Sequence, residues 1–225
     1  TRKNNSPPLV AADWPTYRAN NQRTAATPVR VPDKLKLAWQ TAPRETIEPT
    51  APVAAAGLTV VAGSDGAVRA YDSATGKSRW TAWTGGAINY PPSIADGRVH
   101  VGSGDGRAWC FDLATGKPLW CFQAAPLQRR IPVYGRLLST WPVASGVMVA
   151  DGVAYCAAGI ICHDGTHVYA LDAATGKIRW QNNKSGNLLG EDESVGVSVQ
   201  GHMLLHNNIV HMAGRNVVSP AKFDI

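Results

Sequence analysis

The chain has 225 residues and a formal net charge of +6, from 22 Lys and Arg against 16 Asp and Glu. The basic residues are scattered and form no stripe with interleaved aromatics, which argues against a nucleic-acid-binding protein. No apolar run approaches the roughly 20 residues that a membrane helix needs, so we expect no transmembrane segment. No signal peptide is visible at the start of the sequence.

Residues 1–34 are rich in Pro, Asn, Arg and Thr with little periodicity, so we expect an extended N-terminal arm. Within the arm, DWPTYRANNQRT contains Trp14 and Tyr17. We expect these two rings to fill a groove or the base of the domain rather than to bind a ligand. The next segment, KLKLAWQ, alternates like a strand and ends at Trp39.

The rest of the chain is organised by a repeat. AYDSATGKSRW at 70–80 recurs as CFDLATGKPLW at 110–120 and as ALDAATGKIRW at 170–180. The residues before each Asp alternate like a half-buried strand, Asp-x-x-Thr-Gly-Lys is a turn, and a second strand ends in Trp. We expect each Trp to pack between neighbouring units. The residues that we expect to be structural are Asp72, Gly76, Trp80, Asp112, Gly116, Trp120, Asp172, Gly176 and Trp180.

Another hairpin precedes each copy. Asp-Gly pairs stand at 65–66, 105–106 and 164–165, and further turn pairs stand at 56–57, 96–97 and 151–152. One unit is therefore four antiparallel strands, and the units lie near 50–84, 90–123, 141–182 and 196–225. The 40 residues from Trp80 to Trp120 match the period of a β-propeller blade. Four-stranded solenoid or sandwich units are the alternative.

The motif A-x-D-x-x-T-G-K-x-x-W resembles the tryptophan-docking motif of the pyrroloquinoline quinone (PQQ)-type propeller repeats. That family contains quinone-dependent alcohol and sugar dehydrogenases and cofactor-free relatives such as the bacterial outer-membrane assembly lipoprotein BamB. The resemblance covers roughly residues 39–225 and implies an all-β propeller of antiparallel blades. It does not separate the two branches, because the motif is structural in both. It also implies a periplasmic or extracellular protein.

Three full units, a strand ending at Trp39 and an unfinished fourth unit predict a partial propeller over residues 35–225. We therefore expect a fragment of a larger propeller of about six to eight blades. The missing blades would be its first partner, because a propeller without them leaves sheet faces and edges uncovered.

Two connections between units are longer than the first. Trp120 to Gly152 is 32 residues, against 17 from Trp80 to Gly97, and the next connection is also extended. The second hairpin of the third unit gains four residues. Successive connections of an antiparallel unit alternate between its two ends, so nearly all the inserted length belongs to one face. Loops at such a face are where function is usually carried.

This face supplies the candidate ligand-binding residues. Both signs of charge, an imidazole and a phenol suit a polar ligand such as a carbohydrate or an acidic polymer, and a protein partner is the other option. No catalytic residue is assigned, and the alternative is that the long loops only pack on one another. The candidates are Arg129, Arg130, Tyr134, Arg136, His163, His202 and Glu191, accompanied by Asp164, Asn187, Asp192 and Glu193.

The four cysteines are compatible with either redox compartment. We expect Cys110 to face Trp120, with Cys121 as its diagonal neighbour, which is poor disulfide geometry. Cys156 and Cys162 flank one turn and are better placed for a disulfide.

Histidines give weaker signals. His163 and His167, with the neighbouring cysteine at 162, have loosely metal-like spacing but span a tight turn, so we predict no metal site. His202 and His206 would share one face of a strand, either as core residues or as a catalytic pair.

Three functions remain open. A binding or scaffold domain without cofactor is the leading hypothesis, because the repeat is short and lacks the vicinal Cys pair that the family's alcohol dehydrogenases usually carry. The second is a PQQ-dependent dehydrogenase, with a Trp stacked on the quinone and the acidic loop at 191–193 holding calcium. The third is a polysaccharide lyase in which Tyr134, Arg136, His163 or His202 neutralises a uronate and moves its α-proton.

Overall fold

The computed structural model describes residues 8–42, 47–133, 135–161, 164–186, 196–214 and 219–224. All the secondary-structure elements assigned within these ranges are β-strands. No helix in the described part of the chain is long and apolar enough to cross a membrane. The all-β fold class predicted from the repeat is therefore confirmed.

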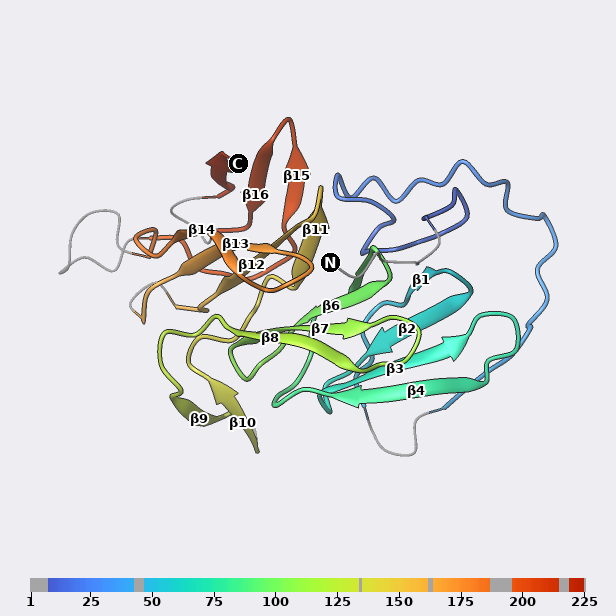
Figure 1. Ribbon diagram of the computed structural model, residues 1–225, viewed down its shortest axis with the longest axis horizontal. Helices are drawn as coiled ribbons and strands as arrows, with labels where there is room; N and C mark the ends of the chain where they lie inside the picture. Colours follow the sequence, from blue (N-terminus) through green and yellow to red (C-terminus); the bar gives the residue numbers. More distant parts are fainter. Residues whose placement is uncertain are drawn as a thin grey trace.

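Four sheets follow one another in chain order, and each is antiparallel with its strands in sequence order (Figure 1). The first contains β1 (Val53–Ala55), β2 (Leu58–Ala62), β3 (Ala67–Asp72) and β4 (Ser78–Trp83), and the second β5 (Ser93–Ala95), β6 (Arg98–Gly102), β7 (Arg107–Asp112) and β8 (Pro118–Gln123). The third contains β11 (Val147–Ala150), β12 (Val153–Ala158), β13 (His167–Asp172) and β14 (Ile178–Asn182), and the fourth β15 (Leu204–His206), β16 (Ile209–Met212) and β17 (Ala221–Asp224). A separate hairpin of β9 (Arg130–Val133) and β10 (Arg136–Ser139) lies between the second and third sheets in sequence.

The hydrophobic core is divided among the junctions between successive sheets. Val68 and Ala70 of β3 are buried against the second sheet, whereas Arg69 and Tyr71 on the other side of β3 are half-buried. The predicted alternation of this strand is therefore confirmed. In the third sheet both sides of β13 are buried, because one side packs on the second sheet and the other on the fourth. Neighbouring blades thus cover each other's faces.

The two ends of each blade form two different faces of the molecule. At one end of each blade, the turn after the first strand is hydrogen-bonded to the turn after the third strand. In the second blade, Leu113 N donates to Gly97 O at 2.9 Å. We call this end the turn face. At the other end, the turn after the second strand is hydrogen-bonded to the connection that follows the fourth strand. In the second blade, Ala124 N donates to Gly106 O at 3.0 Å. We call this end the connection face. The same pairs recur in other blades, as the alternation of antiparallel connections requires.

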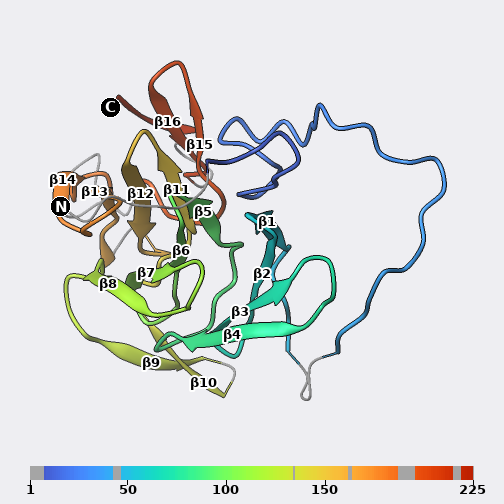
Figure 2. The same ribbon diagram turned by 45° about the vertical axis from the view of Figure 1, so that its right-hand side comes forward.

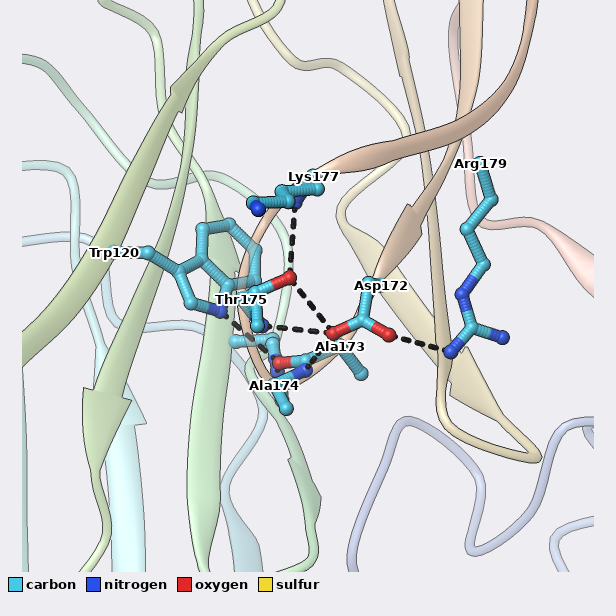
Figure 3. A network of polar contacts seen from close by, with 8 residues as sticks. Trp120, Asp172, Ala173, Ala174, Thr175, Lys177 and Arg179 are labelled. Carbon is cyan, nitrogen blue, oxygen red and sulfur yellow. Dashed lines mark hydrogen bonds and ion pairs between the residues drawn. The ribbon is translucent and has the colours of Figure 1, made fainter. Parts of the chain in front are cut away.

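Each Thr-Gly-Lys turn is held by its own Asp. In the third blade, Asp172 accepts hydrogen bonds from the backbone N of Ala174 and of Thr175 and from the Thr175 hydroxyl, and it pairs with Arg179 (Figure 3). Asp72 makes the same bonds to Ala74 and Thr75 in the first blade. The repeated Asp therefore fixes a tight turn on the turn face.

These turns receive the tryptophan of the preceding unit. Trp80 Nε1 donates to Leu113 O at 2.8 Å, and Trp120 Nε1 donates to Ala173 O at 3.0 Å (Figure 3). Each ring lies against the glycine of that turn, so a Cβ at Gly116 would stand only 2.6 Å from the Trp80 ring. Trp39 makes the corresponding contacts with the turn at 72–77 of the first blade.

Trp180 differs from the other repeated tryptophans. Its side chain is 37% exposed, and its ring meets the Phe223 ring edge-on at 6.0 Å. In the described residues no Gly-containing turn lies against it. Trp180 therefore still meets the next unit, through Phe223, but without the Gly-containing turn that receives Trp80 and Trp120.

One local expectation also fails. Residues 34–42 form no strand, because no hydrogen-bonded neighbour accompanies them, and Leu35 and Leu37 are exposed. In the second blade an irregularity shifts the register after Cys110, so that Pro118 pairs with Phe111. Cys110 nonetheless faces Trp120 as predicted.

The N-terminal arm crosses the first strands of the blades (Figure 2). Trp14 forms a backbone bridge with Ala54 of the first blade, and Ile94 N of the second donates to Pro15 O at 2.7 Å. Asn21 reaches two blades, because its side chain donates to Val149 O and its carbonyl accepts from Leu205 N. These contacts fasten this part of the arm to the blades.

Candidate functional site

The long connection after the second blade contains the hairpin β9–β10, which lies beyond the ends of β4 and β8 (Figures 1 and 2). Residues 136–139 pair with residues 130–133, and Gly135 at their junction has φ of +78°. From the sequence we predicted a long connection here and no hairpin. A signal was available, since a glycine separates two short runs of alternating residues, but Pro132 counts against a strand.

The hairpin is held over the second turns of three successive blades. Arg136 Nη1 donates to Ser64 O of the first blade at 3.0 Å, and Ser139 N donates to Gly104 O of the second at 2.8 Å. Arg129 Nη2 bonds Asp164 Oδ1 of the third at 2.7 Å. These contacts bring the predicted residues Arg129, Arg136 and Asp164 together on the connection face.

Arg129 is fixed by more than its ion pair. Its guanidinium lies 4.6 Å from the centre of the Trp141 ring, and its Nε donates to Thr140 Oγ1 at 3.2 Å. Trp141 is buried and donates its Nε1 hydrogen to the Asp164 backbone carbonyl. The base of the hairpin is therefore locked to the third blade.

A cavity of about 290 Å³ lies behind the hairpin on the connection face. Leu138 of β10 forms part of its wall, together with Gly102 and Gly104 of the second blade. Its polar side chains among the described residues are those of Asn89, Tyr90 and Gln200, and none of the described lining residues is charged.

His202 is placed elsewhere than the strand position that we expected. β15 begins at Leu204, so His202 precedes the strand and does not share its face with His206. Its ring stacks on Tyr17 of the arm at 3.8 Å and meets Tyr90 edge-on at 5.1 Å. Burial, with the nearby charges of Arg23 and Arg18, lowers the pKa of His202 to about 4. It is therefore neutral at physiological pH and serves the packing of the arm.

Several candidates lie outside the described residues: Tyr134, His163, Asn187, Glu191, Asp192 and Glu193. Cys162 lies outside them as well. Cys156 is a buried free thiol, so the structure does not form the disulfide that we expected at this residue. Cys110 and Cys121 are also free, as expected from their register. The described ranges hold no group of three His, Cys, Asp or Glu that could bind a metal ion.

A PQQ-repeat family model described as "Outer membrane protein assembly factor BamB" matches residues 29–133. No curated protein matches the chain.

Solved structures match over most of the chain. The quinohemoprotein alcohol dehydrogenase from Comamonas testosteroni is 22% identical, with a TM-score of 0.68 over 90% of this chain and 35% of that one. BamB from Moraxella catarrhalis is 19% identical, with a TM-score of 0.63 over 84% of this chain and 53% of that one. The computationally designed Ika4 protein is 14% identical, with a TM-score of 0.59 over 85% of this chain and 99% of that one. This chain thus spans about a third to a half of the two natural proteins. At these identities the likeness shows the fold.

Proposed function

Because this chain belongs to the PQQ-type repeat family of β-propellers, we propose that it is a binding or scaffold domain rather than an enzyme. Its ligand is a carbohydrate, another polar polymer or a protein, and the connection face is the binding surface. We propose a periplasmic or extracellular location, in keeping with the description of the matching family as an outer membrane protein assembly factor.

One observation carries this proposal. The inserted connection forms an ordered hairpin whose contacts reach the second turns of three blades, and it gathers Arg129, Arg130 and Arg136 on one face. An irregular loop that only fills space does not need anchors on three separate blades. A rigid platform with exposed cations suits recognition of a partner, since little order has to be gained on binding.

We assign the repeated tryptophans to this framework. Trp39, Trp80 and Trp120 would act as the family's docking tryptophans, each fixing its own unit to the next through a ring on glycine and an indole hydrogen bond. These contacts lie on the turn face and leave the connection face open for function.

A quinone-dependent dehydrogenase is the second candidate, favoured by the solved alcohol dehydrogenase among the structural neighbours. PQQ carries three carboxylates, and its calcium needs several oxygen ligands. The described walls of the cavity on the connection face offer the amides of Asn89 and Gln200 and the phenol of Tyr90, with no cation and no carboxylate. The described lining of this cavity therefore does not fit PQQ and calcium, and we derive no step through them.

The test combines ligand screening with assays for the two enzymatic alternatives. The protein is screened against an array of neutral and acidic glycans and against a random peptide library. We expect at least one ligand whose affinity falls about tenfold in Arg130→Glu and is unchanged in Lys117→Glu on the turn face. Dye-coupled alcohol oxidation after addition of PQQ and Ca²⁺, or release of unsaturated uronate, would contradict the binding role.

A further inference from the structure

The two sides of the hairpin β9–β10 have different surroundings. Side chains of an antiparallel pair alternate, and directly paired residues share a side. Arg136 and Leu138 belong to the side that contacts the blades, through Ser64 O and the cavity behind the hairpin. Pro132 pairs with Leu137 on the other side, where Leu137 is 60% exposed; Ser139, which pairs with Arg130 at the base of this side, is buried.

We call this other side, with the residue that leads into the hairpin, the hairpin surface. It consists of Leu127, Arg130, Pro132 and Leu137, all of which are exposed. Leu127 is 63% exposed, so two leucines of a short segment stand in solvent beside an arginine. Exposed aliphatic side chains on one short segment favour a protein-interaction site.

The charge of this surface is one-sided. The sequence contains no Asp or Glu between Asp112 and Asp151, whereas Arg129, Arg130 and Arg136 lie within that span. Arg129 is paired with Asp164, and Arg136 donates to Ser64 O. Arg130 makes no ion pair with any described residue. Its guanidinium is therefore the group that is available for a carboxylate supplied by another molecule.

We propose that the hairpin surface binds a protein partner through a segment that sets an Asp or Glu carboxylate against Arg130. Aliphatic side chains of the same segment pack on Leu127 and Leu137. This inference rests on the binding function proposed above and names the partner class and the residues that contact it. Since the patch is small, the contact belongs to the weak, transient class of interfaces, with a Kd of roughly micromolar order.

The contact is made by side chains rather than by strand addition. Pro132 lies within β9 and has no N–H group to donate to an added strand. The hairpin edge is thus a poor template for pairing, whereas Arg130 and the two leucines remain accessible.

Two other classes of ligand fit this surface less well. Sugars are commonly held on flat aromatic rings, and the described hairpin residues include no exposed aromatic side chain. Anionic membranes are held by clusters of about four to eight cations, whereas Arg129 and Arg136 are already engaged with the blades.

The test begins with selection of random twelve-residue peptides, displayed on phage, for binding to the whole protein. The affinities of synthetic copies of the selected peptides are then measured by fluorescence anisotropy. We expect the selected peptides to combine at least one acidic residue with aliphatic residues. Their affinity should fall at least tenfold in Arg130→Glu and in Leu137→Ser, and it should weaken at higher salt. Matched controls on the turn face are Lys117→Glu and Leu119→Ser, which should leave it unchanged; Leu119 is 47% exposed.

Polygalacturonate and vesicles containing about 30% phosphatidylglycerol are titrated with the same variants. Binding of either that depends on Arg130, with no hairpin-dependent peptide, would overturn the protein partner and leave the binding function standing. Selected peptides that bind all variants with equal affinity would also overturn the inference. If no peptide, polygalacturonate or vesicle binds in a way that depends on Arg130, both proposals are overturned.

Discussion

Glycine at the repeated turn decides how closely two blades approach. The residue has positive φ, which glycine adopts freely, and the tryptophan ring of the preceding unit occupies the space where a side chain would begin. Gly116 thus meets two requirements at once. The turn motif in the sequence predicts the first requirement, a positive φ. It does not predict the second, the space that the tryptophan ring needs.

Gly116→Ala and Gly57→Ala separate these two requirements. Both glycines have similar positive φ, +70° and +75°, but a Cβ at Gly57 meets nothing within 4 Å. We expect Gly57→Ala to lower the free energy of unfolding by about 1–2 kcal/mol through backbone strain. Gly116→Ala should lower it by about 1–3 kcal/mol more, because the methyl collides with the Trp80 ring. Equal losses in denaturant titrations would show that the ring contact is unimportant.

The tryptophans should not be equivalent. Trp120→Ala removes a half-buried ring and its hydrogen bond to Ala173 O, so we expect a loss of about 3 kcal/mol in unfolding free energy. Trp180→Ala should cost about 1 kcal/mol, because that ring is more exposed and meets only an edge of Phe223 among the described residues. Thermal denaturation of both variants checks this order, and a larger loss for Trp180→Ala would reverse our assignment.

At the scale of elements, the sequence predicted the blades better than the connections. The strands around each Asp-x-x-Thr-Gly-Lys turn have strong local signals, namely alternation on one side and turn chemistry on the other. The hairpin β9–β10 has a weak signal, because Pro132 interrupts it and its stability comes from distant contacts such as that between Arg136 and Ser64. The segment 34–42 shows the opposite case, in which an alternating pattern forms no strand because no described segment of the chain pairs with it.

His100 should make the junction of the second and third sheets sensitive to acid. Its side chain is fully buried, its Nε2 contacts Ala173 O at 3.1 Å, and its ring lies near Trp120. Burial lowers its pKa from the usual 6.5 of a histidine to about 4. The folded state therefore favours neutral His100, and its contribution to stability is present above pH 6.5 and is lost as the pH falls toward 4.

The expected loss is up to about 1.4 kcal/mol for each pH unit within that window. His100→Gln keeps a side-chain amide that can donate to Ala173 O but cannot be protonated, so its unfolding free energy should depend less on pH between 6.5 and 4. His206→Gln, at an exposed position, is the control and should retain the wild-type slope. Parallel pH profiles for wild type and His100→Gln would contradict this assignment.

At the scale of the whole molecule, the arm joins blades that are far apart in sequence. Arg23 holds the arm through several hydrogen bonds. Its Nε donates to Met203 O, and its Nη1 donates to Thr16 Oγ1 and to Tyr17 O. The arm's composition suggested an extended segment, but these partners depend on where the blades bring Met203 and Val149. No local pattern in the sequence could have shown them.

Arg23→Ala should release the arm without unfolding the blades. The variant leaves several carbonyl groups without their donor, at a cost of about 2 kcal/mol. We expect thermolysin to cut within residues 14–25 at least tenfold faster than in wild type. Arg30→Ala removes a side chain that is 86% exposed and should leave the rate unchanged. Unchanged cleavage in Arg23→Ala would mean that the other arm contacts suffice.

The central claim is that the turn face builds the propeller and the connection face carries its function. Hydrogen–deuterium exchange of the protein, with and without the tightest ligand from the peptide and glycan screens, tests it most directly. The account predicts slower exchange on binding in residues 127–139 and in the second turns near 63–66 and 103–106, with no change at 112–117 and 172–177. Protection confined to the Thr-Gly-Lys turns, with the hairpin unaffected, would contradict it.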